Sequence, residues 1–111
     1  MAVYQYKFGP FTQADGAQTI LLPQASRQYF NHAITIAYPS GELPSSGTIL
    51  MQARRSGGTF FEDLDTNSTI DATKTANFPV IEDAIDALMA TPSGLPSGMQ
   101  YWVSVNSFGG Q

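Results

Sequence analysis

The sequence contains no cysteine. The lack of thiols excludes disulfides, thiolate nucleophiles and cysteine-based zinc sites, and it leaves the redox compartment open. Basic residues are also scarce, since five Lys and Arg stand against nine Asp and Glu and give a formal net charge of −4 at pH 7. Because so few cations cannot neutralise a run of backbone phosphates, we expect no nucleic-acid partner.

Long apolar runs are missing as well. No segment approaches the ~20 consecutive apolar residues of a membrane-spanning helix. The first ten residues, MAVYQYKFGP, carry polar side chains where a signal peptide needs an apolar centre. We therefore expect no membrane partner and no secretion by a signal peptide.

Histidine occurs once, as His32. Any histidine-dependent triad or multi-histidine metal site would depend on this residue alone, and no Gly-x-Ser-x-Gly motif supplies a nucleophile. We therefore interpret His32 as a half-buried residue at the start of a strand.

Oxygen ligands with the spacing of a calcium loop occur at Asp63, Asp65 and Asn67. The match then fails, because Ser68 stands where the loop requires glycine and Lys74 stands where it requires a bidentate glutamate. The sequence therefore predicts a solvated loop and no metal site.

Two groups of acids, Glu62 with Asp63 and the acids of 82–86, could in principle supply the carboxylate pair of a glycosidase. Such a pair must face across a cleft with ~5–10 Å between the carboxyl groups. A domain this small, made of two packed layers, rarely offers that cleft. We therefore expect no catalytic residues, no cofactor and no enzymatic activity.

The composition is that of one folded domain over residues 1–111. The chain is 42% hydrophobic and only 13% charged, against roughly 25% charged in an average soluble domain. A surface so poor in charge is compatible with extensive packing against other subunits.

The clearest strand covers 99–107, where Tyr101, Val103 and Val105 alternate with Trp102, Ser104 and Asn106. Similar period-two patterns predict further strands at 3–8, 17–22, 30–38 and 48–54, and an edge strand at 60–64. Small residues on the second face of 30–38 suggest a strand covered on both sides. The Asp15-Gly16 pair favours a hairpin between the first two strands, and 65–77 is an irregular excursion anchored by Ile70.

Two Pro/Gly-rich loops have similar sequences: 39–47 reads PSGELPSSG and 91–98 reads TPSGLPSG. Each stands between two predicted strands, which suggests one corner used twice to pass the chain between two sheets. A weak internal repeat and chance recurrence of turn residues both explain the likeness.

The segment 78–90 fits two structures. Ile81, Ala84, Ile85 and Leu88 form an apolar helical stripe, whereas Ile85, Ala87 and Met89 form one face of a strand. The helical pattern is slightly the better one, and a short helix over 79–89 stays open. Guided by the family likeness described below, we predict a strand from about Ala84.

The candidate binding residues are aromatic. Trp102 lies on the face opposite Tyr101, so it is either covered in the fold or an interface, or exposed for a partner. With Tyr29 and Phe30 it could serve as a stacking platform for sugar rings, which makes a carbohydrate-binding module one alternative. The sequence favours burial of Trp102 in the fold or in an oligomer interface.

The patterns together predict an all-β fold, a single antiparallel β-sandwich of about six to eight short strands. Two segments, GTILMQARRSGGTFFEDLDTNSTID and DALMATPSGLPSGMQYWVSVNSFGG, resemble small β-sandwich structural proteins of tailed-bacteriophage virions. The likeness spans about residues 47–109. It lies in an Arg-Ser-Gly turn, a Phe-x-x-Leu piece, a polar stretch and a TPSGL corner before the last strand.

The resemblance implies a non-enzymatic virion protein made in the host cytoplasm. We expect a capsid decoration (cement) protein that binds the major capsid protein or other virion proteins, with a tail or fibre-associated module as the alternative. It also implies a homo-oligomer, with a trimer favoured, and chain ends at 1–8 and 107–111 that could serve as extended arms.

Overall fold

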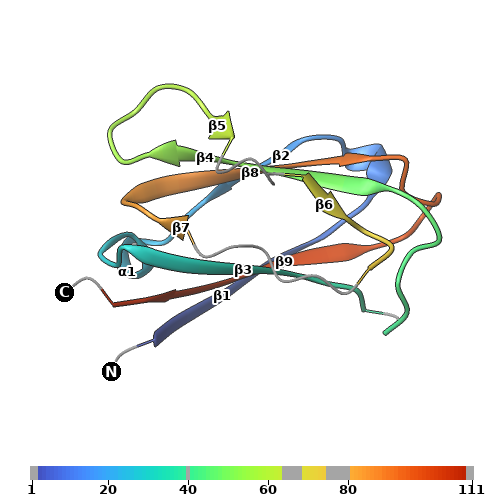
Figure 1. The fold of residues 1–111 in the computed structure, drawn as a ribbon, viewed down its shortest axis with the longest axis horizontal. Helices are drawn as coiled ribbons and strands as arrows, with labels where there is room; N and C mark the ends of the chain where they lie inside the picture. The colour runs from blue at the N-terminus through green and yellow to red at the C-terminus, as the bar shows by residue number, and fades with distance from the viewer. Residues whose placement is uncertain (1–2, 40, 64–68, 75–80, 110–111) are drawn as a thin grey trace.

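The computed structural model describes residues 3–39, 41–63, 69–74 and 81–109. Nine strands lie within these residues, in two antiparallel sheets that pack face to face (Figure 1). Sheet A has the order β1 (Val3–Phe11), β9 (Tyr101–Phe108), β3 (Asn31–Ala37) and β7 (Ile81–Glu82). Sheet B has the order β2 (Gln18–Leu21), β8 (Ile85–Ser93), β4 (Thr48–Arg55) and β5 (Glu62–Asp63), and β6 (Thr69–Asp71) also pairs with β4. The predicted β-sandwich is confirmed.

The core lies between the sheets and is built from one face of each long strand. On β9 the burial alternates along the strand, with Tyr101, Val103 and Val105 fully enclosed. Ile49 and Met51 of β4 and Leu88 of β8 meet them from sheet B. Burying each such side chain stabilises the fold by about 1.5–3 kcal/mol, so these alternating faces dominate folding.

The segment over 79–89 is a strand where it is described. Ile81–Glu82 forms β7, and β8 begins at Ile85. The prediction of a strand from about Ala84 is therefore confirmed and the helix is not formed, since β8 pairs with β2 on one side and β4 on the other. These two ladders satisfy the backbone groups that a helix would have satisfied internally.

The first two strands do not form the predicted hairpin. β1 belongs to sheet A and β2 to sheet B, and the turn between them contains a short 3-10 helix, η1 (Gln13–Asp15). β1 also continues beyond Gly9-Pro10, with a shift of register between Phe8 and Phe11. The alternating pattern shows only that each strand buries one face. Two strands in different, stacked sheets bury one face each, just as two strands of the same sheet do, so the pattern could not tell the two arrangements apart.

Both Pro/Gly corners cross between the sheets. The first leads from β3 in sheet A to β4 in sheet B, and the second leads from β8 in sheet B to β9 in sheet A. The two corners touch, since Ser46 Oγ donates a hydrogen bond to the Gly94 carbonyl at 2.8 Å. Gly47 has a φ of +112°, and a Cβ there would lie 2.7 Å from the Leu95 side chain, so only glycine fits this contact.

The predictions for the edge strand, for Ile70 and for the chain ends are confirmed in part. The edge strand expected at 60–64 is β5, although Leu64 lies outside the described residues. Ile70 is buried as predicted, but it sits in the short strand β6 within the stretch expected to be irregular. Within the described ends of the chain, Val3–Phe8 and Ser107–Phe108 are paired in sheet A, so they are strands rather than free arms.

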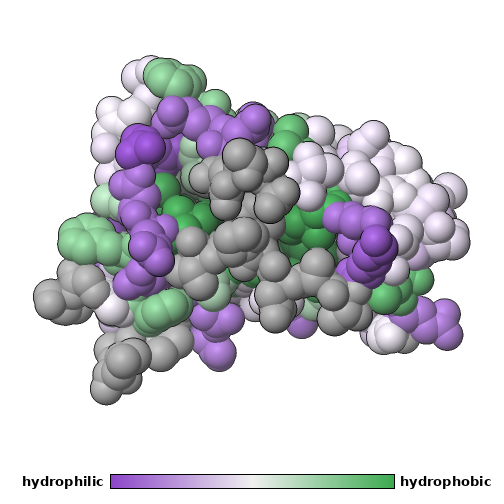
Figure 2. All heavy atoms as spheres, viewed as in Figure 1, coloured by the Kyte–Doolittle hydropathy of each residue, from purple (hydrophilic) through white to green (hydrophobic). Residues whose placement is uncertain are grey.

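A short helix, α1 (Gln24–Arg27), closes one end of the sandwich (Figure 1). Hydrophilic surface gathers at the same end in the view of Figure 2. Arg55 at the end of β4 forms ion pairs there with Glu62 and Asp83. No helix in the described part of the chain has the length and apolar character that crossing a bilayer requires.

Candidate interaction surfaces

Trp102 lies on the outer surface of sheet A and is half-buried. The Lys7 ammonium sits over its ring, 5.0 Å from the centroid. Such a cation–π contact contributes about 0.5–1 kcal/mol at an exposed site, and it holds the positive charge on this face of the sheet. The indole is covered in part by the chain's own lysine, which leaves less of the ring free for a partner.

The other two predicted binding residues lie at the far end of the same sheet. Tyr29 is buried within the fold, whereas Phe30 is 49% exposed. Phe30 precedes Asn31, which pairs with Phe108, while Trp102 pairs with Ala37 at the opposite end of β3. Six residues of strand therefore separate the two ends by roughly 20 Å. The three rings form no single row of stacking platforms.

Face A is the name used here for the outer face of sheet A. Directly paired residues of neighbouring strands share a face, so the register assigns its members. They are Gln5, Lys7, Asn31, Ala33, Thr35, Ala37, Glu82, Trp102, Ser104, Asn106 and Phe108. Small and uncharged side chains fill the middle, and Lys7 and Glu82 are the only charged members.

Asn106 lies near the middle of face A. Its side-chain oxygen, Oδ1, is enclosed by neighbouring atoms and receives no hydrogen bond from the described residues. A shielded amide oxygen without a donor costs about 1–3 kcal/mol. Because the oxygen is shielded from solvent, a donor outside the sheet reaches it only after the Asn106 side chain rotates, and that rotation breaks no hydrogen bond of Oδ1 with the described residues.

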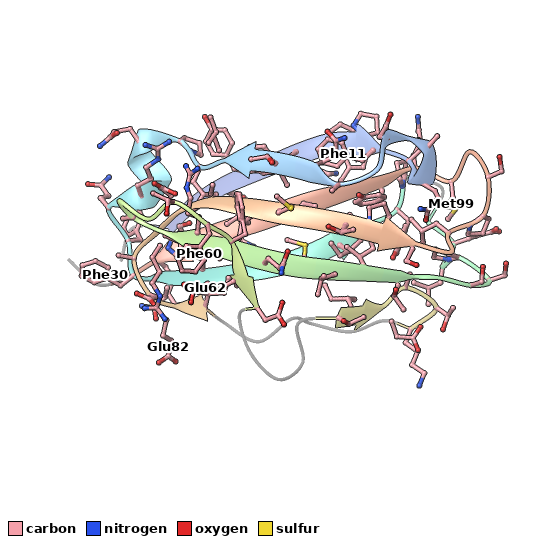
Figure 3. The ribbon with its side chains drawn as sticks, turned by 90° about the horizontal axis from the view of Figure 1, so that it is seen from above. Phe11, Phe30, Phe60, Glu62, Glu82 and Met99 are labelled. Carbon is pink, nitrogen blue, oxygen red and sulfur yellow. The ribbon has the colours of Figure 1, made fainter. Side chains whose placement is uncertain are left out.

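Face B is the name used here for the outer face of sheet B, which faces the viewer in Figure 3. Its apolar members with exposed area are Leu21, Leu50 and Met89, whereas Ala87, on the same face by register, is fully buried. Leu21 is 59% exposed, and Phe60, in the connection between β4 and β5, is 65% exposed at the α1 end of the molecule. Face B thus offers an apolar surface to a partner.

Two polar pairs on face B are formed within the chain. Arg54 Nε donates to Asp86 Oδ1 at 2.8 Å, and Gln52 Nε2 donates to Asp63 Oδ1 at 3.0 Å. Partial desolvation acts to raise the pKa of Asp86, but hydrogen bonding and charge from Arg54 outweigh it and hold this pKa below 3.8. The Arg54 guanidinium also lies over the Phe61 ring at 5.6 Å. These charges therefore serve the fold of sheet B.

His32 is fully buried on the inner side of sheet A, where the sequence predicted half burial. Its Nδ1 lies 2.7 Å from Ser107 Oγ, and its Nε2 has no hydrogen-bond partner in the described chain. Desolvation of the enclosed ring lowers its pKa below 6.5. Since both side chains are enclosed, neither reaches a surface where a substrate could bind.

Tyr101 is a further residue of sheet A whose polar group is buried. Its hydroxyl has no hydrogen-bond partner among the described residues. Burial, with smaller contributions from Asp15 and Tyr38, raises the pKa of Tyr101 to about 12. The ring packs against Phe11 with centroids 5.6 Å apart, so its role is apolar packing at the corner end of the core.

The acids proposed as a carboxylate pair serve other contacts. Glu62 and Asp83 are both paired with Arg55, and Asp86 is paired with Arg54. Glu82 points away from the sandwich at its rim (Figure 3). Within the described ranges, no three acids or histidines gather into a group suited to a metal ion. Of the calcium-like stretch only Asp63 is described, and residues 64–68 lie outside the described chain.

Sequence reasoning did not single out Lys7 or Asn106 of face A, and it considered Glu82 only as one of the possible catalytic acids. A signal was present in the second faces of two predicted strands, which read Trp102, Ser104, Asn106 and Ala33, Thr35, Ala37. Both lack charge, although an outer strand face usually carries some. The missing information was that these two strands are neighbours.

No protein-family model and no curated protein matches this chain. The fold is nevertheless similar to a solved structure, described as the crystal structure of SPBc2 prophage-derived protein YomS. The likeness has a TM-score of 0.58 and 11% sequence identity, and it covers 96% of this chain and 95% of the other. At this identity the match establishes a shared β-sandwich fold over nearly the whole length of both chains.

Proposed function

We propose that this chain is a structural protein of a bacteriophage particle. The observation that carries the proposal is the end-to-end fold likeness to a prophage-derived protein. The sequence supports it independently, because residues 47–109 resemble virion β-sandwich proteins. Neither observation names an activity, so the proposal is one of binding and assembly.

Within the particle we propose a capsid decoration role. A protein that binds the assembled shell but not the dissociated subunits stabilises the shell by mass action. Its partner would be the major capsid protein, with other virion proteins, including those of the tail, as the alternative. The trimer implied by the sequence resemblance stays a prediction.

Face B is the surface we assign to the virion partner. Leu21 and Phe60 are the most exposed large apolar side chains of the described chain, and Leu50 and Met89 extend the apolar surface across the sheet. Burying apolar area stabilises a contact by about 25 cal/mol per Å² before the costs of association. The neighbouring ion pair of Arg54 and Asp86 is already formed, so it need not be broken on binding.

The test is co-sedimentation of the purified protein with phage particles from a strain that carries its gene, stripped of the endogenous copy. We expect saturable binding that falls at least about tenfold in the double variant Leu21→Ser with Phe60→Ser. Leu43→Ser is the matched control, because Leu43 is 44% exposed but lies in the corner 39–47 away from face B. Unchanged binding by the double variant would refute the assignment to face B.

Mass spectrometry of purified particles tests the broader proposal. We expect the chain in intact particles at a copy number set by their symmetry, and immunogold labelling on heads rather than tails. Labelling on tails would move the assignment to the tail-associated alternative. If the chain is missing from particles and does not bind them, the virion proposal fails.

A further inference from the structure

We propose that face A binds face A of a second copy of this chain, through a twofold axis in the plane of the face and diagonal to the strands. This inference goes beyond the proposed function, which rests on face B. It assigns a partner to face A, whose middle carries no charge. Three features of face A carry it: its charge placement, its central amide and its small side chains.

The two charges of face A occupy opposite corners. Lys7 lies on β1, across from Ser104, and Glu82 lies on β7, across from Asn31, which in turn pairs with Phe108. Three strand spacings separate β1 from β7, or about 14 Å. Along the strands the offset is the four residues from Ser104 to Phe108, or about 13 Å.

Because these two offsets are nearly equal, a diagonal twofold axis exchanges the two corners. Lys7 of one copy then faces Glu82 of the other, and the second corner repeats the contact, as a twofold interface requires. The strands of the two copies cross at about 90°, which is one of the two usual ways in which sheets pack. Neither charge has an ion-pair partner in the described chain, so each is available for this contact.

The same axis passes beside Asn106. Its row, Gln5, Asn106 and Ala33, is the second of four along face A, and its strand is the second of four across it. The diagonal therefore brings Asn106 against Asn106 of the second copy. Once each side chain rotates to bring its amide to the surface, Nδ2 of one copy can donate to Oδ1 of the other, and Oδ1 gives up no hydrogen bond to the described residues in doing so.

The side chains between these contacts permit a close approach. Ala33, Thr35 and Ser104 are small, and no charge lies among them. Lys7 is already held on face A by its contact with Trp102, so less of its side-chain freedom is lost on binding. Four strands by seven residues give roughly 400 Å² on each copy, about half of the ~800 Å² per partner in a standard interface. The contact is therefore weak for two free copies and gains strength where copies are anchored side by side.

Sedimentation velocity of the full chain from about 10 μM to about 1 mM is the primary test, because a contact of this area falls in that range. We expect a monomer–dimer equilibrium. Asn106→Asp sets two carboxylates against each other at the axis and should weaken the dimer by at least about tenfold. Ser93→Asp, on face B, is the control that adds the same charge and should leave the dimer unchanged.

The corner contacts have their own test by charge reversal. Lys7→Glu and Glu82→Lys should each weaken the dimer by about threefold or more, and the double variant should recover wild-type dimerisation within about twofold. Reversal of the exposed pair Lys74 and Asp71, which lies outside face A, is the matched control. Thermal unfolding midpoints near that of the wild type confirm that each variant is folded.

A wild-type protein that is monomeric at 1 mM overturns the inference, and so does a trimer, which is the state that the sequence resemblance predicts. A dimer that Asn106→Asp leaves intact also overturns it. Two copies that pair through the open edge of β1 would form such a dimer. Failure here differs from failure of the proposed function. A chain that binds particles through Leu21 and Phe60 but does not dimerise refutes only the twofold contact.

Discussion

On face B, Arg54 and Asp86 lie 2.8 Å apart and Gln52 donates to Asp63, so the charged groups Arg54, Asp86 and Asp63 are paired within the chain. On face A, Lys7 and Glu82 stand at opposite corners and the Asn106 oxygen receives no donor from the described residues. Both faces belong to antiparallel sheets that share one core. They differ in whether their polar groups are satisfied by the fold.

The difference separates two kinds of contribution. Groups paired within the chain stabilise the folded state, so their removal should lower the free energy of unfolding. Groups left unpaired contribute little to folding and gain energy only from a partner. Substitutions in sheet B and in the interior should therefore change stability, whereas those on face A should change association.

The largest expected effect lies beneath face A, at the buried pair of His32 and Ser107. Ser107→Ala removes the hydroxyl 2.7 Å from His32 Nδ1 and leaves a buried ring nitrogen without that partner. We expect a loss of about 1–3 kcal/mol in the free energy of unfolding, measured by urea denaturation. Ser104→Ala, three residues earlier on β9 and on face A, is the control and should stay within about 0.5 kcal/mol.

Next in size is the ion pair of face B. Arg54→Ala removes the partner of a partly buried Asp86 together with the contact over the Phe61 ring. We expect a loss of about 1–2 kcal/mol, between the values for exposed and buried pairs. If Arg54→Ala lowered the free energy of unfolding no more than Lys7→Ala does, the proposed contrast between the two faces would be wrong.

Acidification should weaken the two sheets in different pH windows. Because the pKa of His32 is lowered in the fold, its contribution is complete above pH 6.5 and is lost as the pH falls below that value, at up to about 1.4 kcal/mol per pH unit. The lowered pKa of Asp86 makes its contribution complete above pH 3.8 and lost at more acidic pH. Denaturation series should show the first loss absent in His32→Gln and the second absent in Asp86→Asn. A wild-type stability that is flat between pH 7 and pH 5 would contradict the assignment to His32.

The smallest expected effect on stability is that of Lys7→Ala. It removes a cation–π contact at an exposed position and should cost about 0.5 kcal/mol. Its thermal midpoint should therefore lie close to that of the wild type, while its dimerisation is weaker. A large drop in the midpoint would show that Lys7 serves the fold, as Arg54 does.

Much of the fold was predictable because the period-two pattern of each strand can be recognised in the sequence alone. The alternation of Tyr101, Val103 and Val105 predicted both the strand and its buried face. The corner predicted at 91–98 does lie between two strands, although β8 continues through its first three residues to Ser93. The pattern did not say which strand lies beside which. For that reason the turn at Asp15-Gly16 predicted a hairpin, whereas the chain there passes from one sheet to the other.

The surface was less predictable for the same reason. Trp102 stood out as an aromatic residue, but its contact with Lys7 requires β1 to lie beside β9, a pairing across almost the whole chain. Face A is likewise a property of three strands and a short fourth that are distant in sequence. Its diagonal charges become visible only when the register of Asn31 with Glu82 is known.

The most direct test of the contrast between the two faces is the concentration dependence of backbone amide chemical shifts in wild-type protein, measured by NMR between about 10 μM and about 1 mM. We predict that the shifts that move cluster on face A, at Ala33, Thr35, Ser104 and Asn106, while those of Leu50, Gln52 and Met89 on face B stay constant. Shifts that move on face B instead, or no concentration dependence at all, would contradict the account.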